Sequence, residues 1–190
     1  MKLSCPTQGQ SAVARGAAIR GLEGLMPSSR KSRRHYGYEI GMPFRHGIDP
    51  IDKRYREAWT GKMYCSEGMK WVVRKGQTIA NNFNIEHDIC LEFEGRKHDV
   101  QQKIRLFCCN SERPPEYGDK PTAEEIGVVH SKIPKKEIKY LPSKKKEGEL
   151  IKMLETQIAI NMASEQATLT VKNLLKGRDV GNATIMFHRD

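Results

Sequence analysis

Apolar and polar residues alternate most regularly between residue 157 and the end of the chain. The segments 158–162, 167–171 and 183–187 each place an apolar side chain at every second position, and short polar or glycine-containing stretches separate them. Because successive side chains of a strand point to opposite faces, this period of two predicts strands with one buried face. The short breaks predict that consecutive strands pair with one another as an antiparallel meander.

Similar but shorter patterns occur in the middle of the chain. The run from Trp71 to Val73 is aromatic and β-branched, breaks at Lys75 and Gly76, and resumes at Thr78. This predicts a strand that ends in a turn at Gly76, since glycine adopts positive φ without a steric cost. Further strands are expected at 36–40, 85–93, 103–109 and 126–130, whereas 43–68 is expected to be irregular and polar. About seven or eight short strands are typical of a β-sandwich, so we predict a mainly β fold, an antiparallel β-sandwich.

Residues 11–26 have a different character and predict one helix before the strands. Ser11 suits the N-cap, Pro27 ends the segment, and small or apolar residues recur at helical spacing at positions 14, 18, 22 and 25. The segment also contains three glycines. Each glycine costs about 1 kcal/mol relative to alanine inside a helix. Close packing has to compensate for this cost, either against a sheet or beside a ligand site.

The chain is strongly basic, with a formal net charge of +10 and a pI near 9.4. Such a charge favours acidic partners, among them nucleic acid, an anionic membrane or an acidic protein. Two clusters carry much of the positive charge, one at 30–34 and one at 135–146, and both are expected to lie in loops. Both are interpreted as solvated, flexible runs, although the first also matches a nuclear import signal or a nucleic-acid patch.

The residue patterns of common catalytic and metal sites do not occur in the sequence. The histidines are scattered, no Cys-x-x-Cys pair is found, and the glycine-rich phosphate-binding patterns are missing. Irregularly spaced cysteines, together with the lack of a secretion signal or of an apolar run of about 18 residues, favour a reducing, cytoplasmic location. His87 lies on an apolar strand face and is interpreted as a core histidine. We therefore expect no enzymatic activity, no metal and no cofactor in this chain.

A series of short motifs follows one order along the chain. The stretch 11–18 reads Ser-Ala-Val-Ala-Arg-Gly-Ala-Ala, and the strand patterns at 36–40 and 71–79 come after it. The next motifs are 104–107 with Glu112-Arg113, 126–129 with Ile133-Pro134, and the hairpin pattern 157–171. In this order they resemble the end of the ATPase domain and the substrate-binding β domain of the seventy-kilodalton heat-shock chaperone family. The divergent actin-like-ATPase branch of that family is the most similar, and the resemblance covers nearly the whole chain.

The resemblance implies three parts of the chain. Residues 1–27 would be the C-terminal remnant of an actin-like ATPase domain, 28–35 a basic linker, and 36–190 a β-sandwich substrate-binding-like domain. The chain would then be the C-terminal part of a divergent heat-shock-type actin-like ATPase. Because the nucleotide-binding loops are absent here, ATP is implied only for a full-length relative. The family's apolar linker is replaced by a basic one, and its helical lid is missing.

By this resemblance we expect a chaperone-like module that binds unfolded or extended peptide segments and has no membrane partner. Such peptides bind through backbone hydrogen bonds and a pocket for an apolar side chain. Tyr38, Ile40, Phe93 and Ile104 are the expected substrate-binding residues, although each of them also suits an ordinary sandwich core. The alternative is a basic nucleic-acid-binding β module, whose binding would weaken steeply with salt.

Overall fold

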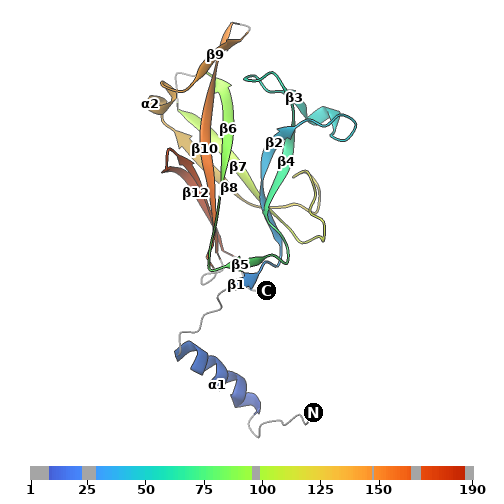
Figure 1. The fold of residues 1–190 in the computed structure, drawn as a ribbon, viewed down its shortest axis with the longest axis vertical. Helices are drawn as coiled ribbons and strands as arrows, with labels where there is room; N and C mark the ends of the chain where they lie inside the picture. Colours follow the sequence, from blue (N-terminus) through green and yellow to red (C-terminus); the bar gives the residue numbers. More distant parts are fainter. Residues whose placement is uncertain (1–8, 23–28, 96–98, 147, 164–167, 187–190) are drawn as a thin grey trace.

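The computed structural model describes residues 9–22, 29–95, 99–146, 148–163 and 168–186. These residues form two five-stranded antiparallel sheets, one two-stranded sheet and two short helices. The prediction of a mainly β fold built from antiparallel strands is therefore confirmed. The two large sheets face one another, and the helix α1 (Gly9–Leu22) lies below them in Figure 1. No helix among the described residues is long and apolar enough to cross a membrane.

The first sheet contains five strands in the order β3-β4-β2-β7-β8. Their bounds are β2 His35–Pro43, β3 Arg54–Arg56, β4 Met63–Val73, β7 Val100–Cys109 and β8 Glu124–Ile133, and the 3-10 turn η1 (Ile51–Lys53) precedes β3. Apolar residues at alternate positions of β7, namely Ile104, Leu106 and Cys108, face the core as their spacing predicts. Cys109 points to the other face of this sheet and is also buried, and both cysteines are free.

The second sheet is organised around β10 (Glu149–Ala163), which pairs with β6 (Asn82–Glu94), with β11 (Thr168–Leu175) and with β9 (Ser143–Lys146). The strand β12 (Arg178–Met186) extends this sheet beyond β11. The antiparallel meander expected near the end of the chain is therefore confirmed for β10, β11 and β12. Residues 164–167 and 187, which belong to the predicted segments, lie outside the described residues.

Two clusters of buried apolar side chains lie between the sheets. The larger one combines Tyr38, Ile104 and Val129 of the first sheet with Ile158 and Val171 of the second, among others. The smaller one consists of Val100, Ile133, Ile138, Leu154 and Leu175. Because each cluster takes residues from both sheets, the sheets pack face to face around a shared apolar layer, whose removal from water stabilises the fold.

The loop between β7 and β8 covers the outer face of the first sheet. A Cβ atom at Gly118 would lie only 3.2 Å from the Phe107 ring and 3.3 Å from the sulfur of Met69, so this loop packs tightly on the sheet. The Met69 N–H donates to the Glu116 carbonyl over 2.9 Å, and the Gly118 N–H donates to the Glu67 carbonyl over 3.0 Å. These bonds hold the loop along part of the edge of β4.

The segment 71–79 behaves as its sequence predicts. The strand β4 ends at Val73, Gly76 has φ of +79°, and β5 (Thr78–Ala80) begins two residues later. The strand β5 pairs with β1 (Ser29–Lys31), so the expected loop at 30–34 is wrong for Arg30 and Lys31. A β-ladder uses backbone groups, and both basic side chains remain exposed in it.

Three other expectations are corrected by the structure. The described residues form twelve strands rather than seven or eight, because short segments such as β3 and β9 join the edges of the sheets. The stretch 43–68, expected to be irregular, contains β3 and the first residues of β4. The lysine cluster at 135–146, expected in a loop, lies largely in the four-residue helix α2 (Lys135–Ile138) and in β9.

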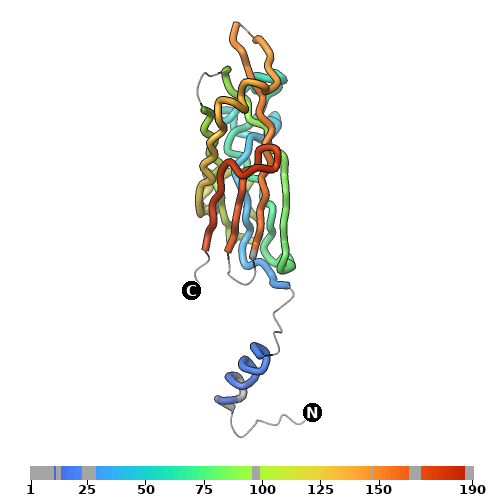
Figure 2. The backbone as a smooth tube through the Cα atoms, turned by 90° about the vertical axis from the view of Figure 1, so that its left-hand side faces the viewer, coloured from blue at the N-terminus to red at the C-terminus, as the bar shows by residue number. Residues whose placement is uncertain are grey.

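The predicted helix at 11–26 is present as α1, which spans Gly9–Leu22, while residues 23–28 lie outside the described part of the chain. Its side chains Ile19 and Leu22 are 51% and 88% exposed. These two apolar residues therefore do not provide the close packing that was expected to compensate for the glycines. Figure 2 shows α1 at one end of the long axis and the β9–β10 hairpin at the other.

Candidate functional site

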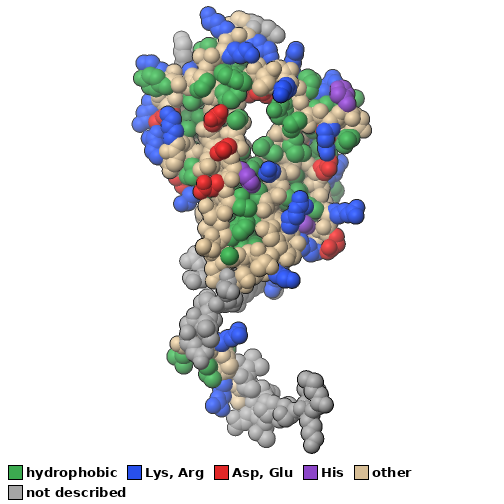
Figure 3. Space-filling view, viewed as in Figure 1, with side chains coloured by type: hydrophobic (Ala, Val, Ile, Leu, Met, Phe, Trp, Pro, Cys, Tyr) green, Lys and Arg blue, Asp and Glu red, His purple; other side chains and the backbone are tan. Residues whose placement is uncertain are grey.

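The two large sheets separate from one another near the end of the molecule that carries β9. Figure 1 shows β6 and β10 on one side of this region and β2 and β4 on the other. The space-filling view in Figure 3 shows an opening that passes through the molecule between them. We refer to it as the intersheet opening. The turn 57–62, which joins β3 to β4, spans it at the outer end.

A carboxylate of β6 holds this turn in place. The Ala58 N–H donates to Oε1 of Glu92 and the Trp59 N–H donates to Oε2, each over 2.7 Å. Hydrogen bonds from backbone N–H groups to an ionised carboxylate are stronger than those between neutral groups. The side chain of Glu92 thus connects the turn of the first sheet to the edge strand of the second sheet.

Two lysines of β9 bind the carbonyl groups of the same turn. Lys144 Nζ donates to the Trp59 carbonyl over 3.0 Å, and Lys146 Nζ donates to the Ala58 carbonyl over 3.1 Å. Ala58 and Trp59, the two residues at the tip of the turn, are therefore each bonded to the second sheet through both the backbone N–H and the backbone C=O. We call this set of contacts, formed by 57–62, Glu92, Lys144 and Lys146, the clasp.

The strands on the two sides of the opening carry half-buried apolar side chains. Leu91 and Phe93 belong to the face of β6 that packs against the smaller core cluster, and neither is fully buried. On β2, Ile40 packs against the larger cluster and is also half-buried. Gly68 lies opposite Ile40, and a Cβ atom there would lie 2.7 Å from Cε of Met42, so Met42 shares this face. Both sheets thus carry incompletely buried apolar side chains on the strands that flank the opening.

Two polar side chains lie close together between β2 and β6, namely Tyr38 and His87. The rings of Tyr38 and His87 have centroids 6.3 Å apart. Burial, and secondly the charge of Lys70, lowers the pKa of His87, which favours the neutral imidazole. Its Nδ1 atom is buried and has no hydrogen-bond partner among the described residues. Burial raises the pKa of Tyr38 to about 12, so the phenol stays protonated and can donate a hydrogen bond.

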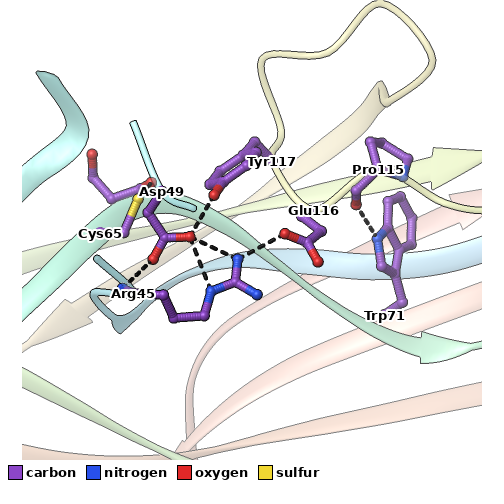
Figure 4. A network of polar contacts seen from close by, with 8 residues as sticks. Arg45, Asp49, Cys65, Trp71, Pro115, Glu116 and Tyr117 are labelled. Atoms are coloured by element: carbon purple, nitrogen blue, oxygen red, sulfur yellow. Dashed lines mark hydrogen bonds and ion pairs between the residues drawn. The ribbon is translucent and has the colours of Figure 1, made fainter. Parts of the chain in front are cut away.

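A network of ion pairs and hydrogen bonds supports the loop that leads into the clasp, as Figure 4 shows. Arg45 donates to Oδ1 of Asp49 through Nε over 3.0 Å and through Nη2 over 2.7 Å, and its Nη2 also lies 2.7 Å from Glu116. The Tyr117 hydroxyl donates to Oδ1 of Asp49 over 2.6 Å. The side-chain bonds from Arg45 and then Tyr117 hold the pKa of Asp49 well below its usual value. This network joins the segment after β2 to the loop between β7 and β8.

The four residues expected to bind substrate occupy two different environments. Tyr38 and Ile104 are 1% and 5% exposed and belong to the larger core cluster. Ile40 of β2 and Phe93 of β6 are half-buried, and they pack against the larger and the smaller core cluster, respectively. The structure therefore places Tyr38 and Ile104 in the core and Ile40 and Phe93 at its margins; the contact of all four residues with a substrate stays a prediction.

Sequence reasoning missed the clasp. Glu92 follows the alternation of β6 as one more polar residue of the outer face, and nothing local distinguishes it from Glu94. The Arg45–Asp49 pair has the four-residue spacing of a local ion pair, so this contact could have been predicted from the sequence. Its partners Glu116 and Tyr117 are separated from it by about seventy positions and could only be found from the fold.

The described residues contain no group of three or more His, Cys, Asp or Glu side chains that could hold a metal ion. Comparison with protein-family models, with curated proteins and with solved structures finds no match for this chain.

Proposed function

We propose that this chain is a chaperone-like module that binds extended peptide segments in the intersheet opening. The single observation that supports this proposal most directly is the opening itself, which is spanned by a hydrogen-bonded turn and lies between strands that carry half-buried apolar side chains. An extended strand of peptide suits a passage of this kind, because its side chains alternate and only every second one needs an apolar contact.

Apolar groups of the protein would bind a side chain of such a peptide, and polar groups would bind its backbone. An apolar side chain of the peptide would be buried between Leu91 and Phe93 of β6 and Ile40 of β2. Burying one such side chain contributes about 1.5–3 kcal/mol. The peptide backbone carries a donor and an acceptor at each residue, and these need partners when they leave water. The exposed Lys70 ammonium of β4, whose charge acts on His87 of β6, provides one polar group between these strands.

The proposal agrees with the family resemblance of the sequence, in which the sandwich is the substrate-binding-like part. By the same resemblance, α1 would be the end of an actin-like ATPase domain, and ATP would act only in a full-length relative. The nucleic-acid alternative has no comparable opening to support it, because its basic segments lie in β1, α2 and β9, at the ends of the molecule.

The test is a fluorescence anisotropy titration of a labelled, extended apolar peptide. We expect saturable binding that is lost when alternate backbone nitrogens of the peptide are methylated, since this removes its N–H donors. The variant Leu91→Gln should weaken binding by about ten-fold, because it removes apolar contact at the opening. The matched control is Cys90→Gln, which changes the neighbouring, exposed position on the other face of β6. Equal binding by both variants would contradict the proposal.

A further inference from the structure

The end of the molecule that carries β9 and α2 has an unusual concentration of lysines. Figure 3 shows Lys and Arg side chains gathered over this end. A pocket of about 490 Å³ lies there between the end of β6, α2 and the β9–β10 hairpin, and it is lined by Gly95, Lys135, Lys136, Ile138, Lys139, Leu150 and Lys152. We call this pocket, with the adjoining Lys145 and Tyr140, the lysine surface.

Most of the ammonium groups of this surface are not neutralised by the protein. Within the described ranges, Lys135, Lys136, Lys139 and Lys145 form no ion pair with a carboxylate. Glu137, the acidic residue of α2, is already bound to Arg178 over 2.5 Å. Like charges this close repel one another, so an anion placed among them relieves that repulsion.

The position of the helix is fixed by the fold rather than by a ligand. Lys152 Nζ donates to the Ile138 carbonyl over 2.9 Å and to the Lys139 carbonyl over 3.4 Å, which holds the end of α2 against β10. Ile138 is 2% exposed and anchors α2 in the smaller core cluster. The lysines of α2 therefore extend from a helix whose position is fixed by packing, next to the β9–β10 hairpin.

Apolar side chains lie exposed among these lysines. Tyr140 is 79% exposed and Leu150 is 40% exposed, and the Lys139 ammonium lies 5.5 Å from the centre of the Tyr140 ring. A phosphate backbone of nucleic acid offers no partner for an aliphatic side chain such as Leu150. The interface of a lipid bilayer satisfies both kinds of group, because tyrosine and leucine enter the boundary region while lysines extend to the headgroups.

From these observations we propose that the lysine surface binds the phosphate-containing headgroups of an anionic lipid bilayer. The β9–β10 hairpin lies at the tip of the long axis in both Figure 1 and Figure 2, and Figure 1 shows α2 below it at the outer edge of the molecule, so both are open to an approaching surface near this end. The contact is peripheral. It requires no membrane-spanning segment, which was the basis for expecting no membrane partner. It is also separate from the intersheet opening, whose clasp uses Lys144 and Lys146 instead.

The experiment is sedimentation of the full chain with vesicles of phosphatidylcholine containing about one-third phosphatidylserine, at low and high salt. We expect binding to these vesicles, a decrease with salt, and no retention by vesicles of phosphatidylcholine alone. Each lysine near an anionic surface contributes a factor of about five in affinity, so Lys135→Gln, Lys136→Gln and Lys139→Gln together should weaken binding by about a hundred-fold. The control makes the same charge change at exposed lysines elsewhere, Lys31, Lys103 and Lys172.

Two further measurements distinguish binding to a lipid bilayer from binding to nucleic acid and from attraction by charge alone. Replacing Tyr140 and Leu150 with serine should weaken vesicle binding without changing its dependence on salt, because it removes only the apolar contact. A single-stranded oligonucleotide at the same phosphate concentration should compete poorly. Stronger binding to the oligonucleotide than to vesicles, equal loss in the control triple variant, or retention by uncharged vesicles would overturn the proposal. Circular dichroism and thermal unfolding confirm that each variant is folded before it is compared.

Discussion

Replacing Glu92 with glutamine tests whether the clasp controls access to the intersheet opening. The substitution keeps the shape of the side chain but turns one of its two acceptors into an N–H₂ donor. That donor would then face either the Ala58 N–H or the Trp59 N–H, both of which are 2.7 Å from a carboxylate oxygen in the native protein. The turn 57–62 should therefore detach from β6 more often, while the two sheets stay folded.

The free energy that the attached turn loses in this variant follows from the hydrogen bonds that change. A bond to a charged group contributes about 1.5–3 kcal/mol, and the partly exposed turn favours the lower part of that range, because water can replace the acceptor. Losing one such bond and weakening the other costs about 2 kcal/mol in the attached state. Since 1.4 kcal/mol corresponds to a factor of ten, the detached state should become about thirty-fold more populated.

Amide hydrogen exchange at residues 58 and 59 measures this change, and stopped-flow fluorescence with a labelled peptide measures its consequence. We expect faster exchange at both amides, and faster association and dissociation of peptide with a smaller change in affinity. Glu94→Gln makes the same chemical change two positions along β6, where the structure shows no hydrogen bond to the turn. Unchanged exchange in Glu92→Gln, or an equal change in Glu94→Gln, would refute the reasoning.

Three other substitutions test the packing and the electrostatics of the fold. Leu154→Ala should lower the free energy of unfolding by about 3 kcal/mol in urea denaturation, because Leu154 is fully buried, whereas Leu150→Ala at a 40% exposed position should cost far less. Tyr117→Phe should lower the urea midpoint by removing the hydroxyl that donates to Asp49, and Tyr140→Phe should not. The bonds from Arg45 and Tyr117 lower the pKa of Asp49, so its ionised form stabilises the native state at neutral pH, and this contribution is lost as the pH falls below about 4 towards the native pKa. Asp49→Asn should therefore show a smaller loss of stability between neutral and acidic pH than the native protein, measured by thermal unfolding; an equal loss would contradict this assignment.

Segments with a strict period of two were predictable from the sequence. In β6, the apolar positions from Ile85 to Phe93 face the core side and their neighbours are largely exposed, because the pleat of a strand turns alternation into two faces. The buried face of β7 follows the same rule. Both are long strands of regular sheets, in which local pattern and tertiary packing agree.

Strands at the edges of the sheets were not predictable in the same way. The four residues of β9 are Ser143 and three lysines, a composition that suits a solvated loop, yet they pair with the start of β10 through backbone groups. In β4, Glu67 has φ of +59° and lies where the pairing with β2 shifts register, so this part of the strand interrupts the alternation. In both cases the neighbouring strand determines the structure, and the local sequence does not.

The candidate site was only partly predictable for a related reason. Of the four residues expected to bind substrate, Tyr38 and Ile104 lie in the core, whereas Ile40 and Phe93, which share their apolar character, are half-buried. A hydrophobic position on a strand does not reveal where two sheets separate, since that depends on the contacts of a turn far away in the sequence. The clasp depends on a carboxylate more than thirty positions away from the turn that it holds.

Photo-cross-linking tests the proposed peptide site most directly. A labelled extended peptide with a benzophenone side chain at its central position would be irradiated with the full chain, and the adducts located by mass spectrometry. We predict saturable adducts on Met42 of β2 and on Leu91 or Phe93 of β6, which compete with unlabelled peptide. Adducts confined to α1 or the lysine surface, or the absence of any saturable adduct, would contradict the proposal that peptides bind between the sheets.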